Sequence, residues 1–275
     1  MVLTIDAGNT RTKWALFDSN GKICHQGMCL NADIANTHFL PSTFSCQHIM
    51  ISNVAGPQHA EQLQQRINQY TTNITWCVSN HQANNVINHY THPELLGSDR
   101  WAALIAAWHI HHAPCVVVNA GTATTIDAII SKTMDGETYG EFVGGMILPG
   151  ISLMQNSLGL ATAQLSTAST STPTRQSSAI NPFSITTNEA IYSGAVYATL
   201  GAIDLMLKAM QAHSPRLVIS GGNALSLHEE IIATNSTSTP IYTLKPVLIA
   251  KNLVLHGLYL LAQPIIHKTS KSTLS

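Results

Sequence analysis

The chain contains one short pattern twice, and this repeat limits the folds that it can adopt. Residues 3–17, LTIDAGNTRTKWALF, align without a gap with residues 116–130, VVVNAGTATTIDAII, at an offset of 113 positions. Each copy has an apolar run that ends in an Asx residue, a glycine turn and a second alternating run, which is the pattern of strand, turn and strand. The alignment pairs Ala7 with Ala120, Gly8 with Gly121, Thr12 with Thr125 and Ala15 with Ala128. The repeat therefore predicts two related halves.

Strand and helix patterns alternate after each copy of the repeat, which favours an α/β fold. The expected strands are residues 48–55, 74–79 and 216–222, and the expected helices are residues 59–70, 100–111, 189–212 and 248–262. The segment GGMILPG, residues 144–150, is expected to form a tight turn that leads into a helix, with Pro149 in its first turn.

A length of 275 residues agrees with two domains. We expect an N-terminal lobe of residues 1–113 and a C-terminal lobe of residues 114–262, followed by a disordered tail at 263–275. Residues 161–187 are rich in Ser and Thr, and they predict a long loop or lid.

The composition excludes several classes of protein. Only 10% of the residues are charged and the net charge is -1, so nothing favours binding to nucleic acid. The five cysteines show no CxxC spacing, which argues against a disulfide framework and a zinc site. The N-terminus lacks the pattern of a secretory signal, and the apolar stretch 248–266 carries polar residues that favour a buried helix over a membrane span. We therefore expect a cytoplasmic protein without membrane or nucleic-acid partners.

The first glycine turn lies between an acid, Asp6, and a base, Lys13. A glycine turn can bring backbone N–H groups close to a phosphate because no side chain blocks the approach. A carboxylate beside that phosphate suits Mg²⁺, which prefers oxygen ligands and shares them with substrate phosphates. The alternative is an ordinary hairpin with an Asx turn and an exposed lysine.

Six motifs occur in an order that resembles a known family. They are DAGNTRTK at 6–13, the segment from Tyr90 to GSDRW at 97–101, NAGTATT at 119–125, GGMILPG at 144–150, the helix segment from Thr187 to Gly194, and SGG at 220–222. Together they resemble type III pantothenate kinase, of the superfamily of sugar kinases, actin and chaperone ATPases. The resemblance runs from residue 1 to about residue 260. It implies two ribonuclease H-like lobes with a nucleotide cleft between them, and ATP-dependent phosphorylation of pantothenate in coenzyme A synthesis.

The resemblance also implies site residues and partners. Asp99 matches the catalytic proton acceptor, and Asp6 matches the residue that orients Mg²⁺. The matched ATP-binding positions are Asp6, Ala7, Gly8, Asn9, Thr10, Arg11, Thr12, Lys13 and Thr122, and the matched substrate positions are Tyr90, Gly97, Ser98, Asp99, Arg100 and Thr187. The family also implies a homodimer, with the acceptor site near the interface.

Each of these side chains also has a structural interpretation. Asp99 suits the N-cap of a helix that begins near Arg100, and Thr187 suits the N-cap of a later helix. Arg100 has the planar fork that binds a carboxylate, which pantothenate possesses, but it could also form a surface salt bridge. Tyr90 could be an aromatic at the edge of the core.

One position departs from the family pattern. Asn119 stands where family members usually have an acid that resembles a ligand of a monovalent cation, K⁺ or NH₄⁺. An amide keeps an oxygen ligand but removes its charge, so we expect weaker K⁺ dependence here. Two other functions stay open: another small-alcohol or sugar kinase of the superfamily, and a nucleotide-binding transcriptional accessory factor.

Overall fold

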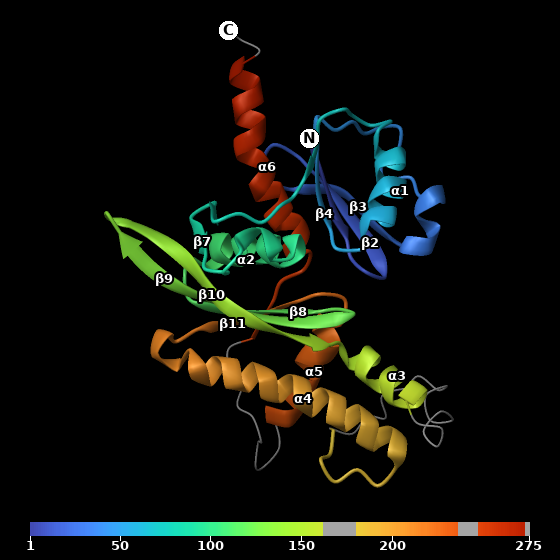
Figure 1. Ribbon diagram of the computed structural model, residues 1–275, viewed down its shortest axis with the longest axis vertical. Helices are drawn as coiled ribbons and strands as arrows, with labels where there is room; N and C mark the ends of the chain where they lie inside the picture. The colour runs from blue at the N-terminus through green and yellow to red at the C-terminus, as the bar shows by residue number, and fades with distance from the viewer. Residues whose placement is uncertain (162–179, 236–246, 273–275) are drawn as a thin grey trace. The chain divides into compact units, whose positions relative to one another are not determined.

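The computed structural model describes residues 1–161, 180–235 and 247–272 of the chain (Figure 1). These residues form an α/β fold that divides into two compact units. Unit 1 contains residues 1–112, 131–142 and 252–275, and unit 2 contains residues 113–130 and 143–251. Most of the loop expected at 161–187 lies outside the described residues.

Unit 1 is built on a five-stranded sheet in the order β3-β2-β1-β4-β5. Its strands are β1 Val2–Ala7, β2 Arg11–Phe17, β3 Ile23–Leu30, β4 His48–Asn53 and β5 Ile74–Trp76. The central strand β1 pairs antiparallel with β2 and parallel with β4. Three further strands form a small group in this unit, in which the first part of β10 Glu137–Pro149 pairs with β7 Val86–Asn88, and β7 pairs with β6 Gln82–Ala83.

Helices cover both faces of the unit 1 sheet. Helix α1 Pro57–Ile67 and the 3₁₀ helix η1 Asn31–Asn36 cover one face, and the core there includes Leu3, Ile5, Ile34, Leu63 and Ile67. Helices α2 Ser98–His111 and α6 Leu253–Ser272 pack against each other, and α6 also packs on β1 and β4 (Figure 1). A short 3₁₀ helix, η2 Pro93–Leu95, precedes α2.

Unit 2 repeats this plan around strand β8. It contains β8 Cys115–Ala120, β9 Ala123–Met134 in its first part, the second part of β10, β11 Arg216–Ser220 and β12 Val247–Ile249. Strand β8 pairs antiparallel with β9 and parallel with β11, as β1 does with β2 and β4. The helices are α3 Ile151–Ala161, α4 Thr187–Ala209, η3 Gln211–His213 and α5 Ala224–Asn235. Buried side chains of β8, β11, α4 and α5 form the core.

The repeat predicted from the sequence is confirmed as two strand-turn-strand units, but its gapless alignment is wrong beyond the turn. Ala7 faces Thr12 in the first hairpin, whereas Ala120 faces Thr124 in the second. The second turn is therefore one residue shorter. Thr12 corresponds to Thr124 rather than to Thr125, and the identity between Ala15 and Ala128 has no structural counterpart.

Three further predictions about secondary structure need correction. GGMILPG forms no turn, because β10 continues through both glycines and Pro149 is its last residue. Gly144 adopts a φ of +133°, and the strand keeps alternating in exposure after it. The C-terminal segment belongs to unit 1 rather than to the second lobe, and α6 continues to Ser272 where a disordered tail was expected from residue 263.

Helix α4 is, among the described helices, the one long and apolar enough to cross a membrane by length and composition. Its Val196, Leu200 and Ile203 side chains are nevertheless buried in the core of unit 2. One third of the apolar window of this helix is buried inside the structure.

Candidate functional site

An acid and a base face each other at the end of the first hairpin in unit 1. Asp6 of β1 lies opposite Lys13 of β2 in the antiparallel register, and opposite Ser52 of β4 in the parallel register. Side chains of directly opposed residues point to the same face of a sheet. The face that carries Asp6 is the one on which α6 and α2 pack, since Phe17 on that face stacks on Tyr259 of α6.

The environment of Asp6 favours its neutral form. Burial and the nearby negative charge of Asp99 raise the pKa of the Asp6 carboxyl from 3.8 to about 7, although the charge of Lys13 opposes this rise. Two carboxyl groups close enough to perturb each other are typical of a site that receives a cation or a proton. Asp6 and Asp99, which the sequence placed 93 positions apart, are thus brought together.

The first turn of α2 positions Asp99. The helix begins at Ser98 with Gly97 as its N-cap, so the predicted cap role of Asp99 is wrong. Asp99 Oδ1 accepts a hydrogen bond from the backbone N–H of Arg100 at 2.8 Å, and a Cβ on Gly97 would lie 2.7 Å from this oxygen. Burial raises the pKa of the Asp99 carboxyl. The result is a partly exposed carboxylate that is fixed by the backbone of its own helix.

A buried pair of hydroxyl groups joins the two carboxylate-bearing segments. Ser52 Oγ lies 2.8 Å from Ser98 Oγ, and both side chains are buried. Ser52 is the register partner of Asp6, and Ser98 precedes Asp99 in the chain. Sequence reasoning missed Ser52; its position at the carboxyl end of a parallel strand was the signal that could have found it.

Arg100 is buried rather than exposed, so its interpretation as part of a surface salt bridge is wrong. Only 5% of Arg100 is exposed, and its guanidinium carbon lies 5.8 Å from the ring centroids of both Tyr90 and Phe142. These two rings stack on each other at 6.1 Å. Tyr90 itself is 36% exposed. The guanidinium thus lies against two aromatic rings, which restricts its orientation.

The turn after β1 contains three exposed residues at positions 9–11. Gly8 N–H donates to the Arg11 carbonyl at 3.1 Å and closes the turn, while the Asn9, Thr10 and Arg11 side chains are exposed. Thr12 differs from its neighbours because it is completely buried and points to the opposite face of the sheet from Asp6 and Lys13. The predicted nucleotide contact of Thr12 therefore does not use its hydroxyl group.

The corresponding turn in unit 2 is packed closely by two other glycines. A Cβ on Gly150 would lie 2.3 Å from the Gly121 carbonyl oxygen, and a Cβ on Gly221, whose φ is +99°, would lie 2.4 Å from the Ala120 carbonyl oxygen. Gly150 N–H donates to the Thr122 carbonyl at 2.8 Å. The side chain of Thr122 is exposed beside them. The glycines of two distant motifs thus support the second turn by close approach of backbones.

Two other predicted site residues, Asn119 and Thr187, lie in unit 2. Asn119 of β8 is partly exposed and lies opposite Thr125 of β9 and Ser220 of β11. Thr187 is exposed and is the first residue of α4. Its predicted cap role belongs to Thr186, which accepts a hydrogen bond from the Glu189 N–H at 3.3 Å.

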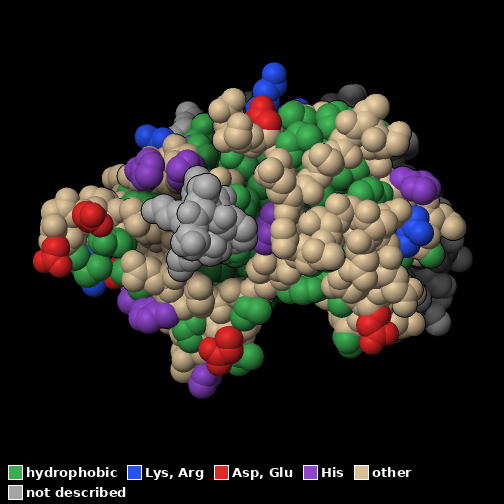
Figure 2. All heavy atoms as spheres, turned by 90° about the horizontal axis from the view of Figure 1, so that it is seen from above, with side chains coloured by type: hydrophobic (Ala, Val, Ile, Leu, Met, Phe, Trp, Pro, Cys, Tyr) green, Lys and Arg blue, Asp and Glu red, His purple; other side chains and the backbone are tan. Residues whose placement is uncertain are grey.

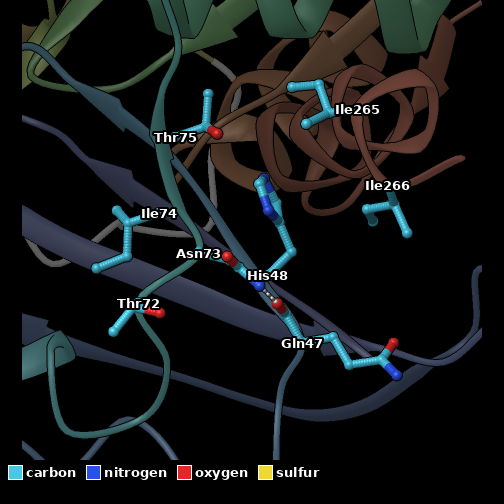
Figure 3. A pocket seen from close by; sticks show the side chains of 8 residues that line it. All are labelled: Gln47, His48, Thr72, Asn73, Ile74, Thr75, Ile265 and Ile266. Carbon is cyan, nitrogen blue, oxygen red and sulfur yellow. Dashed lines mark hydrogen bonds between the residues drawn. The ribbon is translucent and has the colours of Figure 1, made fainter. Parts of the chain in front are cut away.

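The cavity drawn in Figure 3 lies away from these residues. It has a volume of about 450 Å³ in unit 1 and is lined by Gln47, His48, Thr72, Asn73, Ile74, Thr75, Ile265 and Ile266. None of the predicted site residues lines it. His48 is buried there and its Nε2 has no hydrogen-bond partner among the described residues.

The family comparisons agree with the motifs. A family model described as type III pantothenate kinase matches residues 2–209. The chain is 38% identical over 231 residues to a type III pantothenate kinase of Methylobacillus flagellatus, covering 82% of this chain and 86% of that protein. It is 34% identical over 267 residues to one of Nitrosospira multiformis, covering 96% and 91%.

Two solved structures share the fold at low sequence identity. A protein from Campylobacter jejuni described as a Baf family transcriptional activator has a TM-score of 0.56 at 18% identity, covering 96% of this chain and 99% of that one. A protein from Sinorhizobium meliloti described as a 2-dehydro-3-deoxygalactonokinase has a TM-score of 0.55 at 12% identity, covering 96% and 97%. The predicted fold class is confirmed. The extent and identity of the sequence matches show that this chain belongs to the type III pantothenate kinase family.

Proposed function

We propose that this chain transfers the γ-phosphoryl group of ATP to the primary hydroxyl of pantothenate, which gives 4'-phosphopantothenate in the first step of coenzyme A synthesis. Family membership supports the reaction. The observation that carries its assignment to residues is the Ser52–Ser98 hydrogen bond, which brings the strand partner of Asp6 next to the residue before Asp99.

Asp99 is the proposed proton acceptor. Phosphoryl transfer needs in-line placement, charge neutralisation and a group that accepts the hydroxyl proton. A carboxyl group with a raised pKa holds that proton better at neutral pH than an ordinary aspartate does. The hydrogen bond that it accepts from the Arg100 N–H fixes the Oδ1 atom of this carboxyl group.

Asp6 is the proposed residue for Mg²⁺. The described residues contain no group of three or more His, Cys, Asp or Glu side chains suited to a metal ion. Mg²⁺ fits a smaller set, because it commonly binds one or two carboxylates and takes its remaining ligands from phosphates and water. When bound, the ion neutralises phosphate charge. A cation near Asp6 favours the ionised carboxylate, so bound Mg²⁺ would lower the raised pKa of this group.

The two glycine turns and Lys13 are the proposed contacts to ATP. Residues 9–11 are exposed in the turn that follows Asp6 and Ala7, and Lys13 adds a positive charge on the same face as Asp6. In unit 2, Thr122 is exposed on a turn that Gly150 and Gly221 support. Small residues in both turns suit close contact with phosphate oxygens.

Arg100, Tyr90 and Thr187 are the proposed contacts to pantothenate, together with the backbone of Gly97 and Ser98. The guanidinium of Arg100 can bind the pantothenate carboxylate through paired hydrogen bonds. The Tyr90 and Phe142 rings orient the guanidinium group of Arg100. Thr187 is the proposed contribution from a second subunit of a homodimer.

Asn119 is the proposed position for a monovalent cation, with weaker binding of K⁺ or NH₄⁺ than an acid would give. We also propose that the protein acts in the cytoplasm, without membrane or nucleic-acid partners. On the face shown in Figure 2, the Lys and Arg side chains are scattered among uncharged ones rather than gathered into a basic patch.

The test is a coupled assay of ADP release with pantothenate, comparing the wild type with Asp99→Asn. The amide cannot accept the proton, and we expect kcat to fall at least about a hundredfold. Asp33→Asn, at an exposed acid of η1, is the matched control and should keep wild-type activity. Activity of Asp99→Asn within about threefold of wild type would remove Asp99 from the mechanism. A panel of sugars and small alcohols, if phosphorylated faster than pantothenate, would assign the chain a different acceptor.

A further inference from the structure

A chain of hydrogen bonds lies behind the first glycine turn, on the face of the sheet opposite Asp6. The buried Thr12 hydroxyl oxygen lies 3.0 Å from Asn31 Oδ1 and 2.9 Å from His59 Nε2. Asn31 Nδ2 donates to the Gly8 carbonyl at 2.8 Å. Neither Asn31 of η1 nor His59 of α1 belongs to a motif of the sequence.

The direction of each hydrogen bond follows from the available protons. The Asn31 amide donates to Gly8 through its nitrogen, so its oxygen faces Thr12 and accepts the hydroxyl proton. Thr12 has no second proton, so His59 Nε2 must donate to it. Burial lowers the pKa of His59, which makes its ring neutral with the proton on Nε2. The chain thus runs in one direction, from His59 through Thr12 and Asn31 to Gly8.

These hydrogen bonds determine how the glycine turn presents its backbone. Asn31 contacts the turn twice, because its own N–H also donates to the Thr10 carbonyl at 3.1 Å. In a planar trans peptide the carbonyl and the following N–H point in opposite directions. A Gly8 carbonyl held by Asn31 therefore directs the Asn9 N–H away from the helix side. An N–H directed in this way is available to a phosphate oxygen.

We infer that Asn31 and His59 are positioning residues for the phosphates of ATP, acting through Thr12 on the backbone of the turn at residues 8–11. The inference rests on the proposed function, because it takes this turn as a phosphate-binding loop. It assigns affinity for ATP, and not for pantothenate, to two side chains on the far face of the sheet.

Thr12→Val tests the inference because valine has the shape of threonine and lacks the hydroxyl. The variant leaves Asn31 and His59 without their shared partner. We expect KM for MgATP to rise about tenfold, with KM for pantothenate within about twofold of wild type. Thr4→Val is the matched control: Thr4 is also completely buried in this hairpin, and its hydroxyl donates to the Ala15 carbonyl at 3.3 Å, away from the turn. Its KM for MgATP should stay at the wild-type value.

A second pair of variants keeps the test decisive if Thr12→Val does not fold. His59→Gln retains an N–H donor and should keep KM for MgATP within about threefold of wild type, whereas His59→Leu should raise it about tenfold. An unchanged KM for MgATP in Thr12→Val, or in His59→Leu where Thr12→Val fails to fold, overturns the inference. A rise of KM for MgATP in Thr4→Val equal to that in Thr12→Val also overturns the inference.

Calorimetry with MgATP separates this inference from the proposed function. A wild-type protein that binds no MgATP would contradict both. A wild-type protein that phosphorylates pantothenate normally, while the variants keep its KM for MgATP, would contradict the inference alone.

Discussion

Replacing Asp6 with asparagine should stabilise the protein at high pH while it removes activity. The rise of the Asp6 pKa from 3.8 to about 7 means that the folded state holds a proton that the unfolded state has lost. Stability contributed by this group is therefore complete below pH 4 and declines as pH rises to about 7. At about 1.36 kcal/mol per pKa unit, the full penalty at pH 8 is about 4 kcal/mol. The part that develops between pH 5 and pH 8 is about 2 to 3 kcal/mol.

Urea unfolding at pH 5 and pH 8, without nucleotide or divalent cation, measures this effect. Asp6→Asn has no carboxyl to ionise, so its free energy of unfolding relative to wild type should increase by about 2 to 3 kcal/mol between the two pH values. Asp99 titrates in both proteins, and its electrostatic coupling to Asp6 is part of the measured difference. Asp33→Asn, at an exposed acid, supplies the control and should show a constant difference. The reasoning about burial fails if the difference for Asp6→Asn stays constant within about 0.5 kcal/mol.

Four further substitutions, one of them a control, test other parts of the structure. Gly257→Ala places a Cβ 1.8 Å from the Ala102 carbonyl oxygen, so it should separate α2 from α6 and cost about 3 kcal/mol in urea unfolding, whereas Gly194→Ala, which meets open space, should cost less than about 1 kcal/mol. Thr186→Ala removes the N-cap of α4 and should lower the free energy of unfolding by about 1 kcal/mol, and no change would show that the cap contributes nothing. Asn119→Asp should strengthen the response of kinase activity to added K⁺, and an identical K⁺ titration would contradict the proposed cation position.

Both hairpins could be predicted because their evidence is local. An alternating apolar pattern that ends in a glycine turn specifies strand, turn and strand without knowledge of the rest of the chain. The length of each turn could not be predicted in the same way. It depends on packing by distant residues, since Gly150 and Gly221 approach the second turn through their backbones. The same limit applies to α6, which joins unit 1 through contacts with α2 that are remote in sequence.

The start of α2 shows why residue preferences misassigned a cap. GSDRW offers Asp99 as an N-cap residue, because its side chain favours this position. The structure uses Gly97 instead, because the Ser98 hydroxyl contacts Ser52 and the Asp99 carboxylate accepts from the Arg100 N–H. The Ser98 side chain is thus engaged by the candidate site, whereas the Asp99 side chain binds a backbone N–H of the first helical turn. Disagreement of this kind between preference and structure is expected at functional positions.

The two units place different chemistry at the same point of the same scaffold. Asp6 and Asn119 each precede an alanine at the end of a central strand, and each lies beside a serine of the parallel neighbour, Ser52 or Ser220. Across the hairpin, Asp6 faces Lys13, whereas Asn119 faces Thr125. A buried carboxylate requires a compensating charge, and an amide does not. The lysine and the acid therefore belong together. Unit 2 instead places two neutral side chains, Asn119 and Thr125, at the equivalent positions.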